Sequence, residues 1–243
     1  MEHVLLVGDE NTYLRERGGR VELQEGVLDA DDLDAPYGET VETHIGEEFV
    51  VVEPDLDDLF EHGLEQRTQT VSHKDAGYIV ARTGVGKDSR VAEAGTGSGF
   101  LTLTLARVAG EVRSYEQRED HLEAARKNVE KAGAENVTLT HRDVKEEGFD
   151  GEDENDLVAL DMMHPEEAVA NAAASIRSGG YVVCYCPVFE QSRDCLEEFE
   201  ETGLAHTETV EVSRREWRVF PARPEPQTVP HTAFMTIGRL TRV

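Results

Sequence analysis

Lysine, cysteine and long apolar segments are scarce in this chain of 243 residues. Its three cysteines, Cys184, Cys186 and Cys195, are too few for a disulfide scaffold and lack the paired spacing of a zinc knuckle. We therefore expect buried free thiols and no metal site. No apolar run reaches the roughly 18 residues that a membrane-spanning helix needs. The N-terminus lacks the basic region and cleavage site of a signal peptide, so we expect a cytoplasmic protein.

Positive charge is also scarce. Lys and Arg number 24 against 51 Asp and Glu, the formal net charge is −27, and only five of the basic residues are lysines. An ordinary solvated acidic surface is one explanation. We favour halophilic adaptation to molar salt, where the Debye length falls to about 3 Å and many acids with few lysines keep a protein hydrated. The net negative charge then does not exclude a nucleic-acid substrate, but the nucleic acid must bind to a limited part of the surface.

The chain divides into two regions that differ in their predicted secondary structure. Residues 1–62 hold short β-type runs between Gly, Asp and Asn, which predicts a small β-rich, barrel-like domain with a linker. In residues 63–243 strand-like and helix-like segments alternate, and this pattern builds an open, mostly parallel α/β sheet with helices on both faces. Within that region we expect one helix over 165–180 and two late strands over 205–219 and 231–240.

The stretch "RVAEAGTGSGF" (90–100) predicts a ligand-binding turn at the end of a strand. Gly95, Gly97 and Gly99 follow Glu93 at alternate positions. A P-loop would need a Gly-Lys pair, and a dinucleotide fingerprint would place its third glycine three residues after the second. This turn has neither feature. Without Cβ atoms, its backbone can come close to a ligand. A tight turn with no ligand is the alternative.

Two further acids follow the next two strands. Glu116 ends "VRSYE", where a carboxylate can bind both hydroxyls of a ribose. Asp143 follows "NVTLTH", where it can meet an adenine amino group. S-adenosylmethionine suits this set because it contains a ribose and an adenine but no phosphate, and so needs no Lys or Arg clamp.

Four segments resemble the tRNA (adenine-N1)-methyltransferases that modify adenine 58 of the T-loop, in the homo-oligomeric form of archaea and some bacteria. They are "RTQTVSHKDAGYIV" (67–80), "EAGTGSGFLTLTLAR", "SYEQREDHLEAARKN" and "PQTVPHTAFMT" (226–236). The resemblance implies the class I methyltransferase fold, tRNA as substrate, S-adenosylmethionine as cofactor and a homotetramer. It also implies a cofactor site formed by Ser98, Gly99, Phe100, Leu101, Glu116, His121, Asp143 and Asp161.

Asp161, in "VALDMMHPEE", is our candidate catalytic residue because it ends the fourth strand, at the edge that faces the ligand. The family carries Leu-Pro or Leu-Met after this Asp, whereas this chain has Met162, Met163 and His164, and Glu166 where many members have Trp. The base pocket is therefore expected to differ. A helix N-cap is the alternative role for Asp161. His164 could contact RNA or be a solvated loop residue.

Arginines cluster around the single tryptophan in "SRREWRVFPAR" (213–223). Arg214, Arg215, Arg218 and Arg223 surround Trp217 with one acid among them. Arginine beside an aromatic ring suits phosphates and exposed bases. The alternative is that these arginines pair with acids on neighbouring strands or subunits.

Three other functions stay open. They are a non-catalytic RNA-binding subunit, a protein methyltransferase of the isoaspartate-repair type, and a methyltransferase of corrin precursors. The intact turn and Asp161 argue against the first, and the "HTAF" segment (231–234) and the β-rich N-terminus against the second. The sequence does not distinguish methylation of adenine 58 alone from methylation of adenines 57 and 58, nor does it say which tRNAs are substrates.

The halophilic interpretation predicts that the fold strengthens from low to molar KCl, because screening relieves repulsion among 51 acids. The melting temperature, followed by circular dichroism over a KCl series, should rise. A melting temperature that stays flat or falls would contradict the interpretation. RNA binding must be measured separately, since it weakens with salt in any folded protein.

Overall fold

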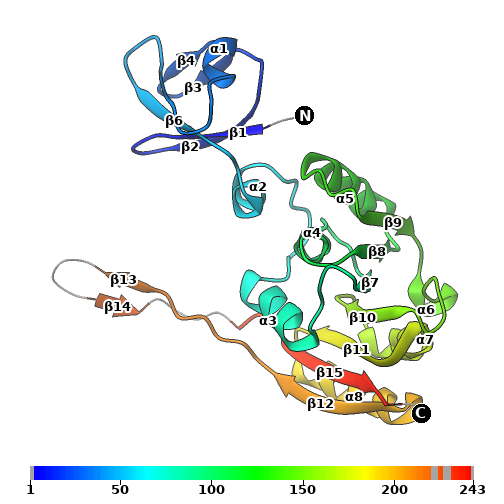
Figure 1. Cartoon of the computed structure of the whole chain (residues 1–243). Coiled ribbons are helices and arrows are strands. Elements are labelled where there is room, and N and C mark those ends of the chain that lie inside the picture. The colour runs from blue at the N-terminus through cyan, green and yellow to red at the C-terminus, as the bar shows by residue number, and fades with distance from the viewer. Residues whose placement is uncertain (1–2, 220–223, 227–230, 242–243) are drawn as a thin grey trace. The chain divides into compact units, whose positions relative to one another are not determined.

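The computed structural model describes residues 3–219, 224–226 and 231–241 (Figure 1). The chain forms two compact units, Met1–Glu65 and Gln66–Val243, against an expected boundary at 62/63. No helix among the described residues is long and apolar enough to cross a membrane. Cys184, Cys186 and Cys195 are buried and free, as expected.

The N-terminal unit is built on an antiparallel sheet of four strands in the order β2-β1-β6-β5. The remaining described strands of this unit form a separate hairpin, β3–β4, so the unit is β-rich, and the barrel-like arrangement stays a prediction. Alternating apolar residues of the sheet, such as Val4, Leu6 and Val51, pack with Leu28 and Leu33 in one core. The elements are β1 (His3–Val7), β2 (Thr12–Glu16), β3 (Val21–Leu23), β4 (Gly26–Leu28), α1 (Ala30–Leu33), β5 (Thr40–Glu42), β6 (Glu48–Val52) and α2 (Leu56–His62).

Acidic runs in this unit coincide with helix starts. In α2, Asp55 accepts a hydrogen bond from the Asp58 amide while Asp58 accepts one from the Asp55 amide, at 3.0 and 2.8 Å. Carboxylates satisfy the unpaired N–H groups of a first turn and oppose the positive end of the helix dipole. Part of the acidic excess therefore caps helices.

The larger unit has a seven-stranded sheet in the order β12-β15-β11-β10-β7-β8-β9. Strands β11, β10, β7, β8 and β9 are parallel neighbours, and β15 runs antiparallel between β11 and β12. From β7, the next two strands in sequence, β8 and β9, are added on one side, whereas β10 and β11 are added on the other side. A topological switch point therefore lies between β7 and β10, and open α/β sheets bind ligands at such a point. The strands are β7 (Arg90–Ala94), β8 (Glu111–Glu116), β9 (Val137–His141), β10 (Asn155–Leu160), β11 (Ile176–Cys186), β12 (Leu204–Val210) and β15 (Phe234–Leu240).

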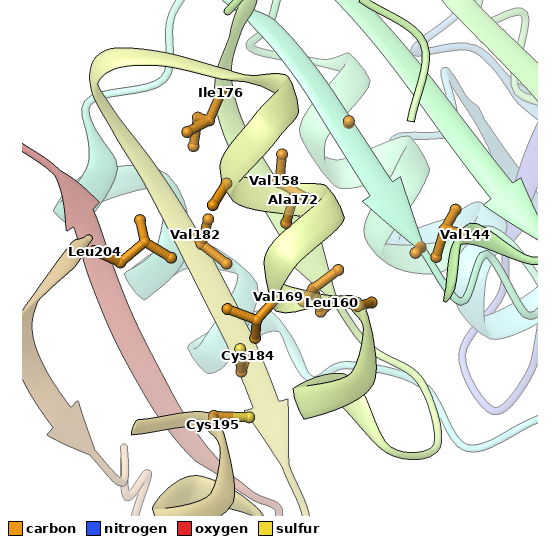
Figure 2. Packing of buried hydrophobic residues seen from close by; sticks show 14 of the residues in the cluster. Val144, Val158, Leu160, Val169, Ala172, Ile176, Val182, Cys184, Cys195 and Leu204 are labelled. Atoms are coloured by element: carbon orange, nitrogen blue, oxygen red, sulfur yellow. The ribbon is translucent and has the colours of Figure 1, made fainter. Parts of the chain in front are cut away.

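Helices pack on both faces of this sheet. On one face, Val169 and Ala172 contact a cluster that includes Val158, Leu160 and Val182 of β10 and β11 (Figure 2). The intervening strand residues, such as Leu157 and Val183, belong to the cluster on the other face with residues of α3 and α4. The helices are α3 (His73–Thr83), α4 (Phe100–Ala106), α5 (Glu119–Lys131), α6 (Val144–Glu147), the 3-10 helix η1 (Pro165–Ala168), α7 (Val169–Ser175) and α8 (Phe189–Thr202).

Two sequence expectations in this unit were wrong at their ends. The helix expected over 165–180 stops at Ser175, because Ile176 is buried and pairs with Asn155 of β10. The strand expected over 205–219 breaks into β12 and a short β13 (Trp217–Val219), which pairs with β14 (Pro224–Pro226). Both differences come from pairing with a strand that is distant in the sequence or separately formed. The pattern of residues within a segment does not reveal such a partner.

The ends of β7 and β10 touch through their backbones. The Asp161 amide donates to the Ala94 carbonyl at 2.9 Å. Gly95 has φ of +91°, and a Cβ atom there would lie 1.8 Å from the Asp161 carbonyl oxygen. Only glycine permits both this dihedral angle and this approach.

Gly95→Ala is therefore expected to destabilise the fold by about 3 kcal/mol or more, since left-handed strain and overpacking against backbone add. Urea unfolding measures the change. Gly77→Ala is the matched control: Gly77 lies exposed in α3 with nothing within 4 Å of an added Cβ, and alanine should stabilise that helix by about 0.5–1 kcal/mol. Equal stability of the Gly95 variant and the wild type would contradict the close contact.

Candidate active site

A cavity opens at the carboxyl ends of β7, β8 and β10, at the switch point. Of the residues predicted for the site, all except Gly99 line it: Glu93, Gly95, Gly97, Ser98, Phe100, Leu101, Glu116, His121, Asp143 and Asp161. Gly99 instead shapes the turn, because it is the N-cap of α4 with φ of +84°. The structure thus brings together acids from the ends of four strands.

Glu116 is held in place by the backbone of the turn. Its Oε2 accepts from the Gly97 amide at 2.9 Å and its Oε1 from the Arg118 amide at 3.0 Å. The carboxylate is 6% exposed and faces the cavity. Each oxygen keeps a further lone pair, so this preorganised carboxylate can accept from two neighbouring hydroxyls of a ligand.

Glu93 is a fully buried carboxyl group with one satisfied oxygen. Thr102 and Ser114 donate their hydroxyls to Oε2, whereas Oε1 is buried without a hydrogen-bond partner. Burial raises the pKa of Glu93 to about 8, with smaller contributions from the charges of Asp161 and Glu116. Such a group is completed by a ligand that brings a positive charge or a donor, and S-adenosylmethionine carries a sulfonium and an ammonium.

Asp161 lies in the same cavity, partly exposed, directly after β10. Burial raises its pKa to about 7, with a smaller contribution from the nearby charge of Glu116. The N-cap of the following 3-10 helix is His164, so the alternative role of Asp161 as a helix cap is wrong. A carboxylate at this place is available for a ligand.

Asp143 and His121 lie on the Glu116 side of the cavity. Asp143 is the N-cap of α6 and accepts from the Lys145 amide at 3.0 Å. His121, in the first turns of α5, places Nδ1 3.9 Å from Glu116 Oε2. Both residues therefore line the cavity beside Glu116.

Sequence reasoning missed one wall of the cavity, the segment Thr68–Val71. The Arg67 amide donates to Ser98 Oγ at 2.8 Å, and a Cβ atom on Gly97 would lie 2.7 Å from Thr68 Oγ1. The segment thus lies against the glycine turn. In the sequence, only the family resemblance of residues 67–80 pointed to this segment. Its contact with the glycine turn joins Arg67 and Ser98, which are 31 residues apart, so no local pattern reveals it. Gln117, Arg118 and Arg142 were missed as well.

The loop after Asp161 forms the outer rim. Met163 is 73% exposed, and His164 has a left-handed backbone with Nδ1 3.0 Å from Glu166 Oε1. His164, Glu166 and Glu167 are close enough together to be considered as metal ligands, but His164 and Glu167 are exposed and Glu167 already pairs with Lys145 at 2.8 Å. His164 therefore has a partner within its own loop.

The arginine cluster around Trp217 is described only in part. Trp217 is 54% exposed, and Arg214 pairs with Glu216. The side chain of Arg218 and all of Arg223 lie outside the described residues. A role in RNA binding stays a prediction.

Residues 48–231 match the family described as "tRNA methyltransferase complex GCD14 subunit". The tRNA (adenine(58)-N(1))-methyltransferase TrmI of Thermus thermophilus is 38% identical over 85% of this chain and 83% of its own. The tRNA (adenine(57)-N(1)/adenine(58)-N(1))-methyltransferase TrmI of Methanocaldococcus jannaschii is 30% identical over 88% of this chain and 86% of its own.

Two solved structures share the whole fold. The tRNA (m1A58) methyltransferase TrmI of Aquifex aeolicus matches with a TM-score of 0.81 at 30% identity, over 100% of this chain and 98% of its own. A Thermotoga maritima structure described as a SAM-dependent O-methyltransferase matches with a TM-score of 0.87 at 29% identity, over 100% and 94%. Both extend over the N-terminal unit as well as the larger one.

The position of Glu116 predicts its contribution to cofactor binding. Glu116→Ala should weaken binding of S-adenosylmethionine by about 1.5–3 kcal/mol, the scale of hydrogen bonds to a charged group. Isothermal titration calorimetry measures the affinity. Glu119→Ala, which removes an exposed carboxylate that lies outside the cavity, should leave it unchanged. An unchanged affinity in folded Glu116→Ala would rule out the ribose role.

Proposed function

The chain belongs to the family of tRNA (adenine-N1)-methyltransferases that includes GCD14 and TrmI, and we propose that it transfers the methyl group of S-adenosylmethionine to N1 of adenine 58 in the T-loop of tRNA. The observation that carries the proposal is the single cavity in which the glycine turn, Glu116 and Asp161 meet. Nucleoside mass spectrometry of unmodified tRNA, incubated with the protein and labelled cofactor in high salt, tests it directly.

The cavity residues fit the cofactor in chemistry. When bound, S-adenosylmethionine supplies an electrophilic methyl group on a sulfonium. Glu116 would bind the ribose hydroxyls, and Asp143 and His121, which also line the cavity, would hold the adenosine end. Glu93, with its unpartnered Oε1, would face the positively charged end. The cavity has two arginines, Arg118 and Arg142, yet Arg118 pairs with Asp120 and Arg142 with Asp150, so neither is set up as a phosphate clamp.

Asp161 is the residue we assign to the acceptor base. Methylation at N1 moves positive charge onto adenine, and a carboxylate near the N6 amino group orients the base and stabilises that charge as it forms. Because the methyl donor is already activated, alignment and electrostatics supply most of the rate. No metal ion is needed in this scheme.

The target base must leave the folded T-loop to react. N1 lies on the Watson–Crick edge, which pairing or stacking blocks, so the adenine is swung out into the cavity. Met162 and Met163 line the cavity, and Met163 is exposed at its rim. These two flexible apolar side chains, where the family carries Leu-Pro or Leu-Met, give the base an adaptable contact.

The alternatives lose support at specific points. A non-catalytic subunit would not need the intact turn and the four cavity acids. The corrin-precursor enzymes match only the fold: a precorrin methyltransferase structure is 16% identical, with a TM-score of 0.63 over 72% of this chain. Peptide and corrinoid controls in the mass-spectrometric assay separate these functions from tRNA methylation.

Four finer properties belong to the same proposal. The relative from M. jannaschii is named for adenines 57 and 58, so methylation of 57 is a second product to look for. We propose a homotetramer on the basis of the family resemblance, a cytoplasmic location with the tRNA pool, and a halophilic source on the basis of the charge of −27. Light scattering in molar salt measures the assembly.

Asp161→Ala should lower the rate of methyl transfer by about 10²–10³-fold, the effect of removing an electrostatic stabiliser of the transition state. Cofactor affinity should change much less than in Glu116→Ala, and the fold should survive. Asp161→Asn keeps the shape and an acceptor oxygen but removes the charge. Near-normal turnover in Asp161→Asn would show that Asp161 only positions the base, and full activity in both variants would refute the assignment.

The pH profile sharpens this test. The carboxylate is the active form, and the pKa of Asp161 is raised to about 7, so kcat/KM, which reports the free enzyme, should rise as pH increases through about 7. In Asp161→Asn the residual kcat/KM for tRNA, measured at saturating cofactor so that Glu93 does not contribute, should lack this rise.

A further inference from the structure

A second buried acid, Asp75, lies outside the cavity and takes no part in the reaction described above. It is 0% exposed, in the first turn of α3. Its Oδ2 accepts from Ser72 Oγ at 2.9 Å, Tyr185 OH at 3.0 Å and Thr232 Oγ1 at 2.8 Å, and its Oδ1 from Lys74 Nζ at 2.7 Å. One carboxylate thus ties together α3, the end of β11 and the residues before β15.

Lys74 is one of only five lysines in the chain, and its side chain is 12% exposed. Besides Asp75, it donates to Thr232 Oγ1 at 2.7 Å. In a chain whose other basic residues are mostly arginine, this enclosed lysine places a compact ammonium with three donors between Asp75 and Thr232.

Such a pair is not explained by stability alone. Removing two charges from water costs more than their attraction commonly returns, and well-packed apolar residues of similar volume are often as stabilising or more so. A buried ion pair with converging hydroxyl donors instead selects one arrangement of the segments that contribute to it. Asp75 joins α3 to segments on both sides of it in the chain.

The segment just before α3 is residues 66–71. Its N-terminal end is bonded to the glycine turn through Arg67 and Ser98, and Thr68–Val71 line the cofactor cavity. Its C-terminal end runs into Ser72, whose hydroxyl is bonded to Asp75. The cavity wall is therefore held at both ends, once by the turn and once by Asp75.

We propose that Asp75, with Lys74 and Thr232, is a positioning group that holds the 66–71 segment against the glycine turn and thereby sets the affinity for the cofactor. The inference rests on the proposed cofactor, S-adenosylmethionine, and not on tRNA as the acceptor. Asp75 acts through the segment and touches neither the cofactor nor the base.

The test compares wild type, Asp75→Asn and Thr232→Val by calorimetry with S-adenosylmethionine and S-adenosylhomocysteine. Asp75→Asn should weaken binding by about 10-fold or more and Thr232→Val by about 3- to 10-fold, if most of a charged hydrogen bond reaches the segment. KM for the cofactor should rise in parallel, while kcat at saturating cofactor stays within about twofold of wild type. Hydrogen exchange of the Arg67 amide should accelerate.

Thr83→Val is the matched control. It makes the same substitution at the other end of α3, where Thr83 Oγ1 only donates to the Ile79 carbonyl, and should change neither affinity nor exchange. If folded Thr232→Val and Asp75→Asn bind the cofactor as wild type does, with only a lower melting temperature, the positioning role is overturned. Should Asp75→Asn not fold, Thr232→Val and Ser72→Ala decide alone. Wild type that binds no S-adenosylmethionine would instead refute the proposed function.

Discussion

The backbone contact between Gly95 and Asp161 is the constraint on which the site depends. Because Gly95 has no Cβ, the ends of β7 and β10 close on each other, with the Asp161 amide bonded to Ala94. That contact sets Asp161 in the same cavity as Glu93 and Glu116, although the three acids are far apart in sequence. In the proposed reaction, the acceptor side and the cofactor side would thus share one strand edge, which suits a transfer that relies on alignment.

Much of the site could be predicted because its residues lie in short sequence segments whose structure is recognisable without knowledge of distant contacts. Glu93 lies next to the end of a strand, Glu116 ends one, and Asp143 and Asp161 follow one, and parallel strands bring such ends to one edge. The spacing of the glycines, with no lysine after them, argues against a P-loop and a dinucleotide fingerprint, and so against a phosphate ligand. The open α/β fold followed from the alternation of strand-like and helix-like segments.

The remainder could not be predicted because it is made of non-local contacts. The segment 66–71 becomes a cavity wall through Arg67 and Ser98, and Asp75 becomes a buried hub through Thr232, 157 residues away. The alanine-rich pattern of 165–180 carried a helix expectation past Ser175, where pairing of Ile176 with Asn155 imposes a strand instead. The periodicity of apolar residues shows which face of a helix or strand is buried, but it does not show which other segment packs or pairs with it.

Glu93 shows how the site exchanges stability for ligand binding. Its pKa is raised from an ordinary value of 4.5 to about 8, chiefly by burial, so the folded chain holds a proton that the unfolded chain has released. Between these two values the folded state binds more protons, and its stability therefore falls as pH rises. A bound sulfonium or ammonium reverses the balance, because it favours the carboxylate that burial disfavours. If the proposed cofactor binds here, the buried acid that weakens the free protein near neutral pH would be stabilised as a carboxylate by the cationic ligand, whereas an anionic or neutral ligand of the same shape would not stabilise it.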